Sequence, residues 1–401
     1  MIGMTVPIDG FVAQGFERVR DEFRRNFESR RELGAAFAVY QDGSPVVDLW
    51  GGYRDVANND LWRQDTMALV FSTTKGMAAL ATVVAHSQGL FELDRPVASY
   101  WPEFGQEGKE RITVRQLLAH EAGLAALDEP LDASKLADLD FVARVIARQK
   151  PAWEPGTRHG YHGLSLGFYQ GELIRRTDRK RRSLGRFFHE EIAQPLDLHF
   201  YIGLPASVPE SRLAVIKGFH PARMMLHLGE LPAGMVLSLL WPRSLTSRAL
   251  LNPKMKRPTD MGNKDYRSVE FASGSGIGEA RAIAKAYGTL AIGGQQLGIR
   301  EDTLSELIAP PKPARRDAVL KANTTYEFGF WKPCEAFLPG MNSKVFGAHG
   351  AGGSIGFCDP QHRLGYAYVM NRMGFRFFDE PREAALRRVV YECIGSPLSS
   401  V

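Results

Sequence analysis

The stretch Phe71-Ser72-Thr73-Thr74-Lys75, followed by GMAALATVVAHSQGL from 76 to 90, decides the fold. Its second part is rich in helix formers and carries an apolar stripe at helical spacing, formed by Met77, Leu80, Ala81 and Val84. We therefore expect a helix that begins at or near Ser72, which places Lys75 over the same face as the serine hydroxyl. The unpaired N–H groups and partial positive charge of a helix N-terminus disfavour a protonated lysine, so a neutral amine can share the serine proton. Taken alone, this S-x-x-K pattern is weak, and a serine that caps a helix with a solvated lysine one turn later would be the better interpretation.

Two further elements support the catalytic interpretation. Tyr161-His162-Gly163 follows the helix-breaking Trp153-Glu154-Pro155-Gly156, and the Gly-rich stretch 347–354 lies at the entry to the last predicted hairpin. A Gly-rich strand lets backbone N–H groups approach a ligand closely, as an oxyanion hole requires. The order S-x-x-K, tyrosine, Gly-rich strand is that of the active-site serine β-lactamases and penicillin-binding proteins.

The chain resembles the class C β-lactamase-like serine hydrolases and, among them, the carboxylesterases called family VIII esterases. The resemblance covers nearly the whole chain beyond the nucleophile and implies a β-lactamase/transpeptidase-like fold. It rests on four blocks: VFSTTKGMAAL, ASYWPEFGQEGKERITVRQLLAHEAGL, WEPGTRHGYHGLSLGFYQGELIRR and FGAHGAGGSIGFCDPQHRLGYAYVMNRM.

The resemblance also implies the candidate site, residue by residue. It implies Ser72 as the nucleophile and Lys75 and Tyr161 as its activating pair. The backbone N–H groups of Ser72 and Ala351 are implied as the oxyanion hole. Substrate binding is assigned to His162, His349 and Gly350. Because His349 stands one place later than in relatives that read His-x-Gly, a structural hydrogen bond is the alternative for it.

Two departures from the β-lactamase pattern bear on the substrate. The tyrosine of class C enzymes opens Tyr-x-Asn, whereas the third position here is Gly163. The final motif of those enzymes is Lys-Thr-Gly, whereas alignment on Gly350 puts Ala348 at the lysine position. The amide that contacts a β-lactam side chain and the cation that binds its carboxylate are both missing. We therefore expect neutral esters to be preferred over anionic β-lactams.

A second serine motif competes for the role of nucleophile. Gly163-Leu164-Ser165-Leu166-Gly167 fits G-x-S-x-G, which marks the nucleophile of α/β-hydrolases only on a strand–turn–helix corner. The residues before it, WEPGTRHGYH, form a Pro/Gly/His loop and not a buried strand. The sequence therefore favours Ser72 over Ser165.

Both ends of the chain combine a helix with antiparallel strands. The pattern predicts an amphipathic helix over about 12–27, hairpins across Asp42-Gly43 and Asp359-Pro360, and a last helix from Pro381. Helix signals dominate the middle of the chain. We expect an α/β (α+β) fold, in which residues 1–71 and 270–401 form an antiparallel sheet flanked by helices and residues 72–269 form an inserted, mostly helical domain with a segment that covers the pocket.

Composition excludes several classes of protein. Of the 401 residues, 44% are hydrophobic and 24% are charged, as in globular proteins, and the net charge of +5 is spread along the chain, which argues against a nucleic-acid partner. Three cysteines are too few for a disulfide framework and match no zinc site, so no metal and no other cofactor is predicted. The first residues lack a secretory signal, and a cytoplasmic location is expected. The expected state is a monomer or homodimer.

The apolar stretch Met224–Trp241 contains His227, Glu230 and Pro232, so it does not fit a membrane span and no stable membrane anchor is expected. Its glycines and proline suit two short pieces folded over a cleft. We interpret it as part of an acyl-pocket wall, with plain core packing as the alternative.

These observations predict a carboxylesterase that cleaves short-chain esters through a Ser72 acyl-enzyme. Lys75 is expected to lower the pKa of the Tyr161 phenol, which then takes the serine proton. The sequence leaves open which of the two groups holds the proton at rest. A transacylase or weak β-lactamase at the same site is one alternative, and a catalytically silent binding protein with this fold is another.

Overall fold

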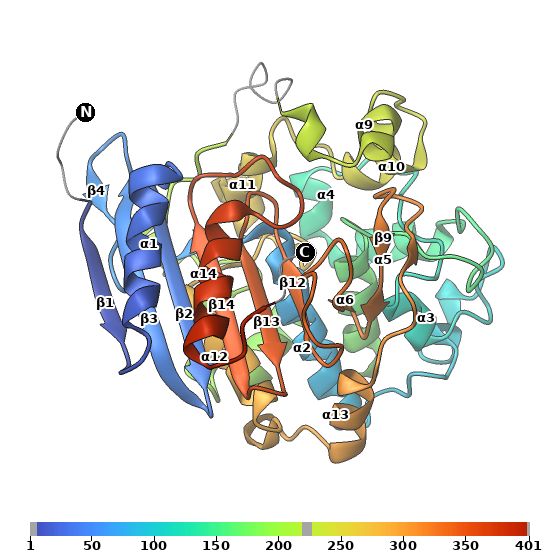
Figure 1. The fold of residues 1–401 in the computed structure, drawn as a ribbon. Helices are drawn as coiled ribbons and strands as arrows, with labels where there is room; N and C mark the ends of the chain where they lie inside the picture. The colour runs from blue at the N-terminus through green and yellow to red at the C-terminus, as the bar shows by residue number, and fades with distance from the viewer. Residues whose placement is uncertain (1–5, 219–226, 399–401) are drawn as a thin grey trace.

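The computed structural model describes residues 6–218 and 227–398 (Figure 1). Within these ranges the main sheet has nine strands in the order β1-β3-β2-β14-β13-β12-β11-β10, with β4 paired to β3. All of its pairs are antiparallel, which confirms the predicted fold class. The strands are β1 Ile8–Val12, β2 Gly34–Gln41, β3 Ser44–Asp55, β4 Asp60–Leu61, β10 Tyr326–Glu327, β11 Phe330–Trp331, β12 Phe346–His349, β13 Ile355–Asp359 and β14 Leu364–Met370.

The two predicted hairpins, β2–β3 and β13–β14, lie side by side at the centre of the sheet. Strand β2 pairs with β14 along nearly its whole length, from Ala35 opposite Met370 to Gln41 opposite Leu364. Because side chains alternate along a strand, the two faces of β2 belong to two apolar clusters. Ala36 and Ala38 enter one cluster, and Ala35, Phe37 and Val39 enter the other. Both faces of the sheet are therefore buried, which explains the continuous apolar run AAFAVY.

Helices cover the sheet on both faces. Helix α12 (Ala280–Ala291) contacts β14, β2 and β13 on one face. Helices α1 (Glu17–Ser29) and α14 (Pro381–Cys393) pack against each other on the opposite face, in front of the sheet in Figure 1. Helix α12 approaches β14 closely because Gly365 has no side chain. A Cβ at this position would lie 2.1 Å from the Gly288 nitrogen and 2.3 Å from the Ala284 oxygen.

The middle of the chain is mostly helical, as predicted. Helix α2 (Thr74–Ser87) packs against α6 and α7, and nearly all of its residues are buried. The other helices are α3 Val114–Leu118, α4 Ala133–Ala137, α5 Leu139–Arg148, α6 Leu166–Thr177, α7 Leu184–Phe188, α9 Ala233–Leu239, α10 Leu245–Leu250, α11 Lys264–Arg267 and α13 Glu301–Ile308. Short strands complete the lobe: β5 Ala68–Leu69, β6 Phe200–Tyr201 and β7 Ile277–Gly278 in one small sheet, and β8 Arg315–Arg316 and β9 Asn323–Thr324 in another.

The division of the chain at residues 71/72 and 269/270 stays a prediction. One apolar cluster contains residues of both predicted parts, among them Ala38 and Val369 from the sheet and Met77 and Phe168 from the helical lobe. Among the described helices, none combines the length and the apolar character that crossing a bilayer demands.

The contact between Gly365 and α12 gives a prediction on stability. Replacing Gly365 with alanine should destabilise the fold by about 2–3 kcal/mol, because the new methyl group overlaps main-chain atoms that cannot move independently. Urea unfolding of the purified variant measures this loss. Gly171→Ala is the matched control, since a Cβ there meets only the Leu184 Cβ at 3.8 Å within helix α6. That substitution should be neutral or stabilise by about 0.5–1 kcal/mol, and equal stability of the two variants would contradict the close approach.

Candidate active site

The chain turns sharply just before Ser72. Phe71 has φ +48°, a left-handed conformation that is rare for a bulky residue and often marks a functional site. Its carbonyl accepts a hydrogen bond from Thr74 Oγ1 at 2.5 Å, and the neighbouring Val70 N–H donates to the Gly276 carbonyl at 3.0 Å. A single turn of 3-10 helix (Phe71–Thr73) then leads into α2. The structure thus places Ser72 at the start of a helix, as the sequence predicts.

Lys75 is fully buried one turn after Ser72. Its Nζ lies 3.0 Å from Ser72 Oγ and donates a hydrogen bond to the Ser273 carbonyl at 2.6 Å. Burial favours the neutral amine over the ammonium and lowers the pKa of Lys75 to about 7. The amine therefore loses its proton near neutral pH, and in the neutral form it can accept the proton of the Ser72 hydroxyl.

Tyr161 faces this pair from the helical lobe. Its ring centroid is 5.0 Å from Lys75 Nζ, and its ring lies against those of His120, Tyr326 and Trp331 at centroid distances of 5.4, 6.0 and 5.3 Å. Burial raises the pKa of the Tyr161 phenol, and hydrogen bonding to Ser72 and Trp331 offsets only part of this shift. The expectation that Lys75 lowers the pKa of Tyr161 is therefore wrong, because desolvation outweighs every favourable neighbour. Lys75, and not Tyr161, is the group with a pKa near neutrality.

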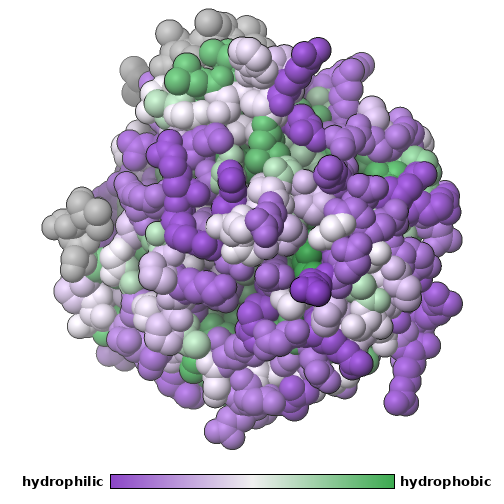
Figure 2. All heavy atoms as spheres, turned by 90° about the vertical axis from the view of Figure 1, so that its right-hand side faces the viewer, coloured by the Kyte–Doolittle hydropathy of each residue, from purple (hydrophilic) through white to green (hydrophobic). Residues whose placement is uncertain are grey.

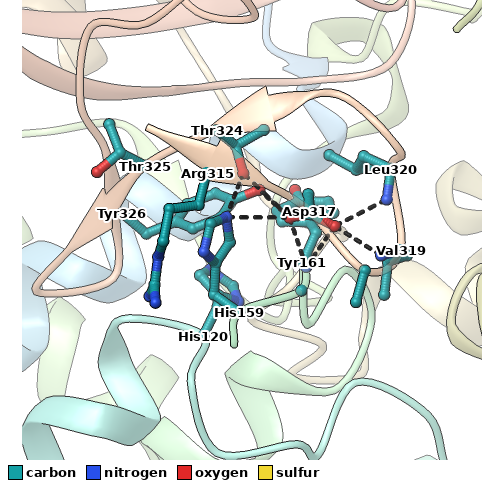
Figure 3. A network of polar contacts seen from close by, with 12 residues as sticks. His120, His159, Tyr161, Arg315, Asp317, Val319, Leu320, Thr324, Thr325 and Tyr326 are labelled. Carbon is teal, nitrogen blue, oxygen red and sulfur yellow. Dashed lines mark hydrogen bonds and ion pairs between the residues drawn. The ribbon is translucent and has the colours of Figure 1, made fainter. Parts of the chain in front are cut away.

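A buried carboxylate, Asp317, holds the Tyr161 main chain in place (Figure 3). The N–H of Tyr161 donates to both of its oxygens, at 2.9 and 3.2 Å. Four further donors saturate the carboxylate: the Val319 and Leu320 N–H groups at 2.7 and 2.8 Å, and the Thr324 and Tyr326 hydroxyls at 3.1 and 2.9 Å. Asp317 thus joins the segment 317–326 to the tyrosine loop. Sequence reasoning missed it, since a single Asp in a loop carries no motif.

The turn between β12 and β13 faces Ser72 with backbone groups. The Ala351 N–H forms no hydrogen bond within the described chain, and the Ser72 N–H lies in the first turn of its helix, where amides lack intrahelical partners. Ser354 Oγ donates to the Val70 carbonyl at 2.7 Å and contacts Thr73 Oγ1 at 3.0 Å, so it ties the turn to the Ser72 segment. Two backbone N–H groups are therefore available to bind an oxyanion.

A cavity of about 620 Å³ opens over Ser72. Among the described residues its lining is mainly apolar and contains neither Asp nor Glu: Phe71, Ser72, Tyr161, Gly163, Leu164, Leu250, Leu251, Pro253, Lys254, Met255, Lys256, Pro258, Met261, Ser273, Gly274, His349, Ala351 and Phe377. Such a pocket suits a small ligand with an apolar body and one reactive polar group.

Of the three residues predicted to bind substrate, only His349 lines this cavity. Its Nε2 is buried and has no hydrogen-bond partner among the described residues. This nitrogen therefore does not form the structural hydrogen bond that was the alternative role for His349. The ring packs 4.7 Å from the Trp331 ring, measured between centroids. Burial, together with the nearby Lys75, lowers the pKa of His349 to about 3, and the imidazole is neutral at physiological pH.

His162 and Gly350 do not line this cavity, so a direct contact of either residue with the substrate stays a prediction. Both ring nitrogens of His162 bind main chain: Nε2 accepts from the Leu124 N–H at 2.9 Å and Nδ1 donates to the Gly160 carbonyl at 2.7 Å. Gly350 allows close packing, since a Cβ there would lie 2.2 Å from the Val70 oxygen and 2.4 Å from Ser354 Oγ. Both residues shape the site without lining the cavity.

The described part of the stretch Met224–Trp241, residues 227–241, does not line the cavity, contrary to the pocket wall that the sequence predicts. Residues 224–226 lie outside the described part of the chain. The wall comes from 250–261 instead. In α9, Met235 enters the core, whereas Leu237 and the following Leu240 and Trp241 are 69%, 76% and 68% exposed. Figure 2, which views the molecule from the right-hand side of Figure 1, shows apolar side chains gathered near its top.

The competing serine, Ser165, is buried at the start of α6. Its hydroxyl donates to the Leu124 carbonyl at 2.7 Å, and it does not line the cavity. No strand of the described chain leads directly into it, so it does not occupy a strand–turn–helix corner. Among residues 6–218 and 227–398 no group of three or more His, Cys, Asp or Glu side chains is arranged to hold a metal ion.

A serine beside a buried amine, a tyrosine facing both, and two free amides are the groups that a serine hydrolase uses to activate a hydroxyl and to bind an oxyanion. Residues 19–390 match the protein family described as Beta-lactamase. The esterase/beta-lactamase LipL of Mycobacterium tuberculosis is 33% identical over 88% of this chain and 80% of its own length. A crystal structure of a family VIII carboxylesterase superposes with TM-score 0.85 at 35% identity, covering 96% of this chain and all of that one.

EstA from Arthrobacter nitroguajacolicus is similar to nearly the same extent, with TM-score 0.83 and 29% identity over 96% of this chain and 99% of its own. The chain belongs to the beta-lactamase family of serine hydrolases, and it is an enzyme of the kind represented there by carboxylesterases. EstCE1, a hydrolase with promiscuous acyltransferase activity, shares the fold at 18% identity.

The lowered pKa of Lys75 predicts the pH dependence of the free enzyme. Because the neutral amine is the form that accepts a proton, kcat/KM for a neutral ester should rise with pH and reach half of its maximum near pH 7. His349 and His162, with pKa values of about 3 and 4, and Tyr161, with its raised pKa, do not titrate in this range. Initial rates between about pH 5 and 9 test this. A flat profile, or a rate that falls as pH rises through 7, would show that Lys75 is not the base.

The Asp317 network predicts a positioning effect on Tyr161. In the native chain all of these donors point at carboxylate oxygens. Asp317→Asn replaces one of the two oxygens by an amide N–H group, which cannot accept a hydrogen bond, so the tyrosine loop should shift. We expect kcat/KM to fall by about 100-fold. Tyr326→Phe is the matched control, since it removes one donor and leaves the carboxylate, and its kcat/KM should change much less. Steady-state rates on variants with a native circular dichroism spectrum measure both effects. Equal activity of Asp317→Asn and the native chain would remove this role from Asp317.

Proposed function

We propose that this enzyme hydrolyses short-chain carboxylic esters through a covalent acyl group on Ser72. The observation that carries the proposal is the contact between Ser72 Oγ and the buried Nζ of Lys75, whose pKa is about 7, at the edge of an apolar cavity. A serine hydroxyl is a weak nucleophile unless a base takes its proton as it attacks. Lys75 supplies that base, and its Nζ forms no ion pair with any residue that the structure describes.

Acylation then follows from the positions of the groups. Ser72 Oγ attacks the ester carbonyl carbon while Lys75 Nζ takes its proton. The carbonyl oxygen gains a negative charge, which the N–H groups of Ser72 and Ala351 stabilise, and loss of one such donor typically costs about 10²–10³ in rate. The ester C–O bond breaks as the alcohol takes a proton from the Tyr161 hydroxyl, which Lys75 restores. Its raised pKa keeps Tyr161 protonated at rest and therefore able to donate.

Deacylation repeats these roles with water. Neutral Lys75 takes a proton from a water molecule that attacks the acyl carbonyl, and the same two amides stabilise the second oxyanion. The bond to Ser72 Oγ then breaks as Oγ takes that proton back from Lys75, and the carboxylic acid leaves. An alcohol in place of water would give acyl transfer to that alcohol. A transacylase is therefore the main alternative at this site, and EstCE1, which shares the fold, is a hydrolase with promiscuous acyltransferase activity.

The surroundings of the oxyanion hole favour esters over β-lactams. Ala348, buried on β12, stands at the position where β-lactamases carry a substrate-binding lysine, and Gly163 replaces the asparagine. A charge-assisted hydrogen bond contributes about 1.5–3 kcal/mol, so two missing anchors cost several orders of magnitude in specificity. An ester that lacks a carboxylate next to the reacting carbonyl makes no use of these two anchors, so their absence does not lower its specificity constant.

The proposal predicts opposite results for the two serines. Ser72→Ala should abolish hydrolysis of 4-nitrophenyl butyrate, because no other hydroxyl of the described chain contacts Lys75 Nζ. Ser165→Ala should leave much of the activity, since its hydroxyl binds only main-chain carbonyls. A fluorophosphonate probe, followed by peptide mass spectrometry, identifies the labelled serine and separates an enzyme from a silent binding protein. Labelling of Ser165, or full activity in Ser72→Ala, would overturn the proposal.

A further inference from the structure

Two lysines stand in the wall of the cavity over Ser72 without a partner. Lys254 and Lys256 both line it, both are exposed, and neither side chain forms a hydrogen bond or ion pair within the described chain. Their segment is fixed by its main chain, because the Lys254 N–H donates to the Leu131 carbonyl at 3.0 Å and the Tyr266 hydroxyl donates to the Lys254 carbonyl at 3.2 Å. The two ammonium groups are therefore carried by an anchored piece of chain.

Three cations close to this segment in the sequence are paired, whereas Arg257, which does not line the cavity, forms no ion pair within the described chain. Arg248, Lys264 and Arg267 each pair with a carboxylate: Arg248 with Asp128, and the other two with Glu210. The cavity itself contains no acidic side chain among its described lining residues, so nothing in its wall neutralises Lys254 or Lys256. Between the two lysines and on either side of them, the wall is apolar: Leu251, Pro253, Met255 and Pro258. An apolar surface with unneutralised positive charge suits a ligand that has an apolar chain and an anionic end.

We propose that the enzyme prefers esters whose apolar chain ends in an anionic group, with Lys254 and Lys256 as the residues that select this group. This inference rests on the proposed function and names its substrate class. It differs from binding of a β-lactam carboxylate, which requires a cation on β12 next to the reacting carbonyl. It also changes the sequence-based expectation of neutral esters, which considered only the positions of Gly163 and Ala348.

The size of the effect follows from the exposure of the two side chains. A solvent-exposed ion pair is weak and screened by salt, whereas the cavity wall removes part of the water around the ligand. Two such contacts should raise kcat/KM by roughly 5- to 20-fold for an anionic ester over a neutral one. Most of this preference should disappear at high salt.

The test uses three 4-nitrophenyl esters of similar length on the native enzyme. One is the monoester of adipic acid, which has a free carboxylate at its far end; the second is its methyl ester, which is neutral; the third is the ester of 6-aminohexanoic acid, which is cationic. We expect kcat/KM to fall in this order, and we expect the anion-to-neutral ratio to shrink as salt rises. Longer diacids place the carboxylate farther from the carbonyl and show which length reaches the lysines.

The variant Lys254→Gln/Lys256→Gln should bring the anion-to-neutral ratio close to one, because kcat/KM falls more for the anionic ester than for the neutral one. Lys264→Gln, an exposed lysine outside the cavity, is the matched control and should keep the ratio. A native ratio near one, or a ratio that survives in the double variant, overturns the inference. Failure of the proposed function looks different, because none of the three esters would then be hydrolysed at a rate that depends on Ser72.

Discussion

The exclusion of water from Lys75 is the constraint on which the rest of the site depends. A lysine ammonium in water keeps its proton until about pH 10, and burial is what lowers the pKa of Lys75 to near neutrality. The burial requires neighbours on every side of α2. Gly76, next to the lysine, leaves room for the Tyr287 hydroxyl from α12 and for Ala348 from β12, which would lie 2.0 and 3.3 Å from a Cβ at that position. The sheet and its covering helix therefore prepare the base, although neither supplies a catalytic side chain.

The same burial assigns different parts to two groups that the sequence treats as a pair. Desolvation disfavours the charged form of each group, so it lowers the pKa of an amine and raises that of a phenol. Lys75 and Tyr161 share one environment and therefore move apart in acidity. Lys75 becomes a base and Tyr161 becomes a hydroxyl donor. This division follows from burial alone and requires no difference in their distances from Ser72. Groups whose pKa values are driven apart in this way are typical of sites that need both an acid and a base.

Local patterns predicted the parts of the structure that depend on local spacing. The hairpins of β2–β3 and β13–β14 follow from their turn residues and apolar runs, and the meeting of Ser72 with Lys75 follows from a separation of three residues on a helix. The position of Tyr161 could not be obtained in this way and came from the resemblance. Asp317, 156 residues further along the chain, has no local signature, and neither does the main-chain carbonyl of Ser273. The wrong expectation for residues 227–241 has a similar cause, since composition does not say that Met235 faces the core while Leu237 faces solvent.

The pairing of β2 with β14 has a consequence for how the protein is made. Strand β2 leaves the ribosome early, but its partner β14 lies more than three hundred residues later in the chain. At roughly 5–20 residues per second, the interval is on the order of 15–60 s. During that time the β2–β3 hairpin carries one unpaired edge and two apolar faces, which is the condition under which strands associate with the wrong partner. The central position of this hairpin in the finished sheet thus makes the nascent chain depend on protection, by chaperones or by its own helical segment, until the last hairpin emerges.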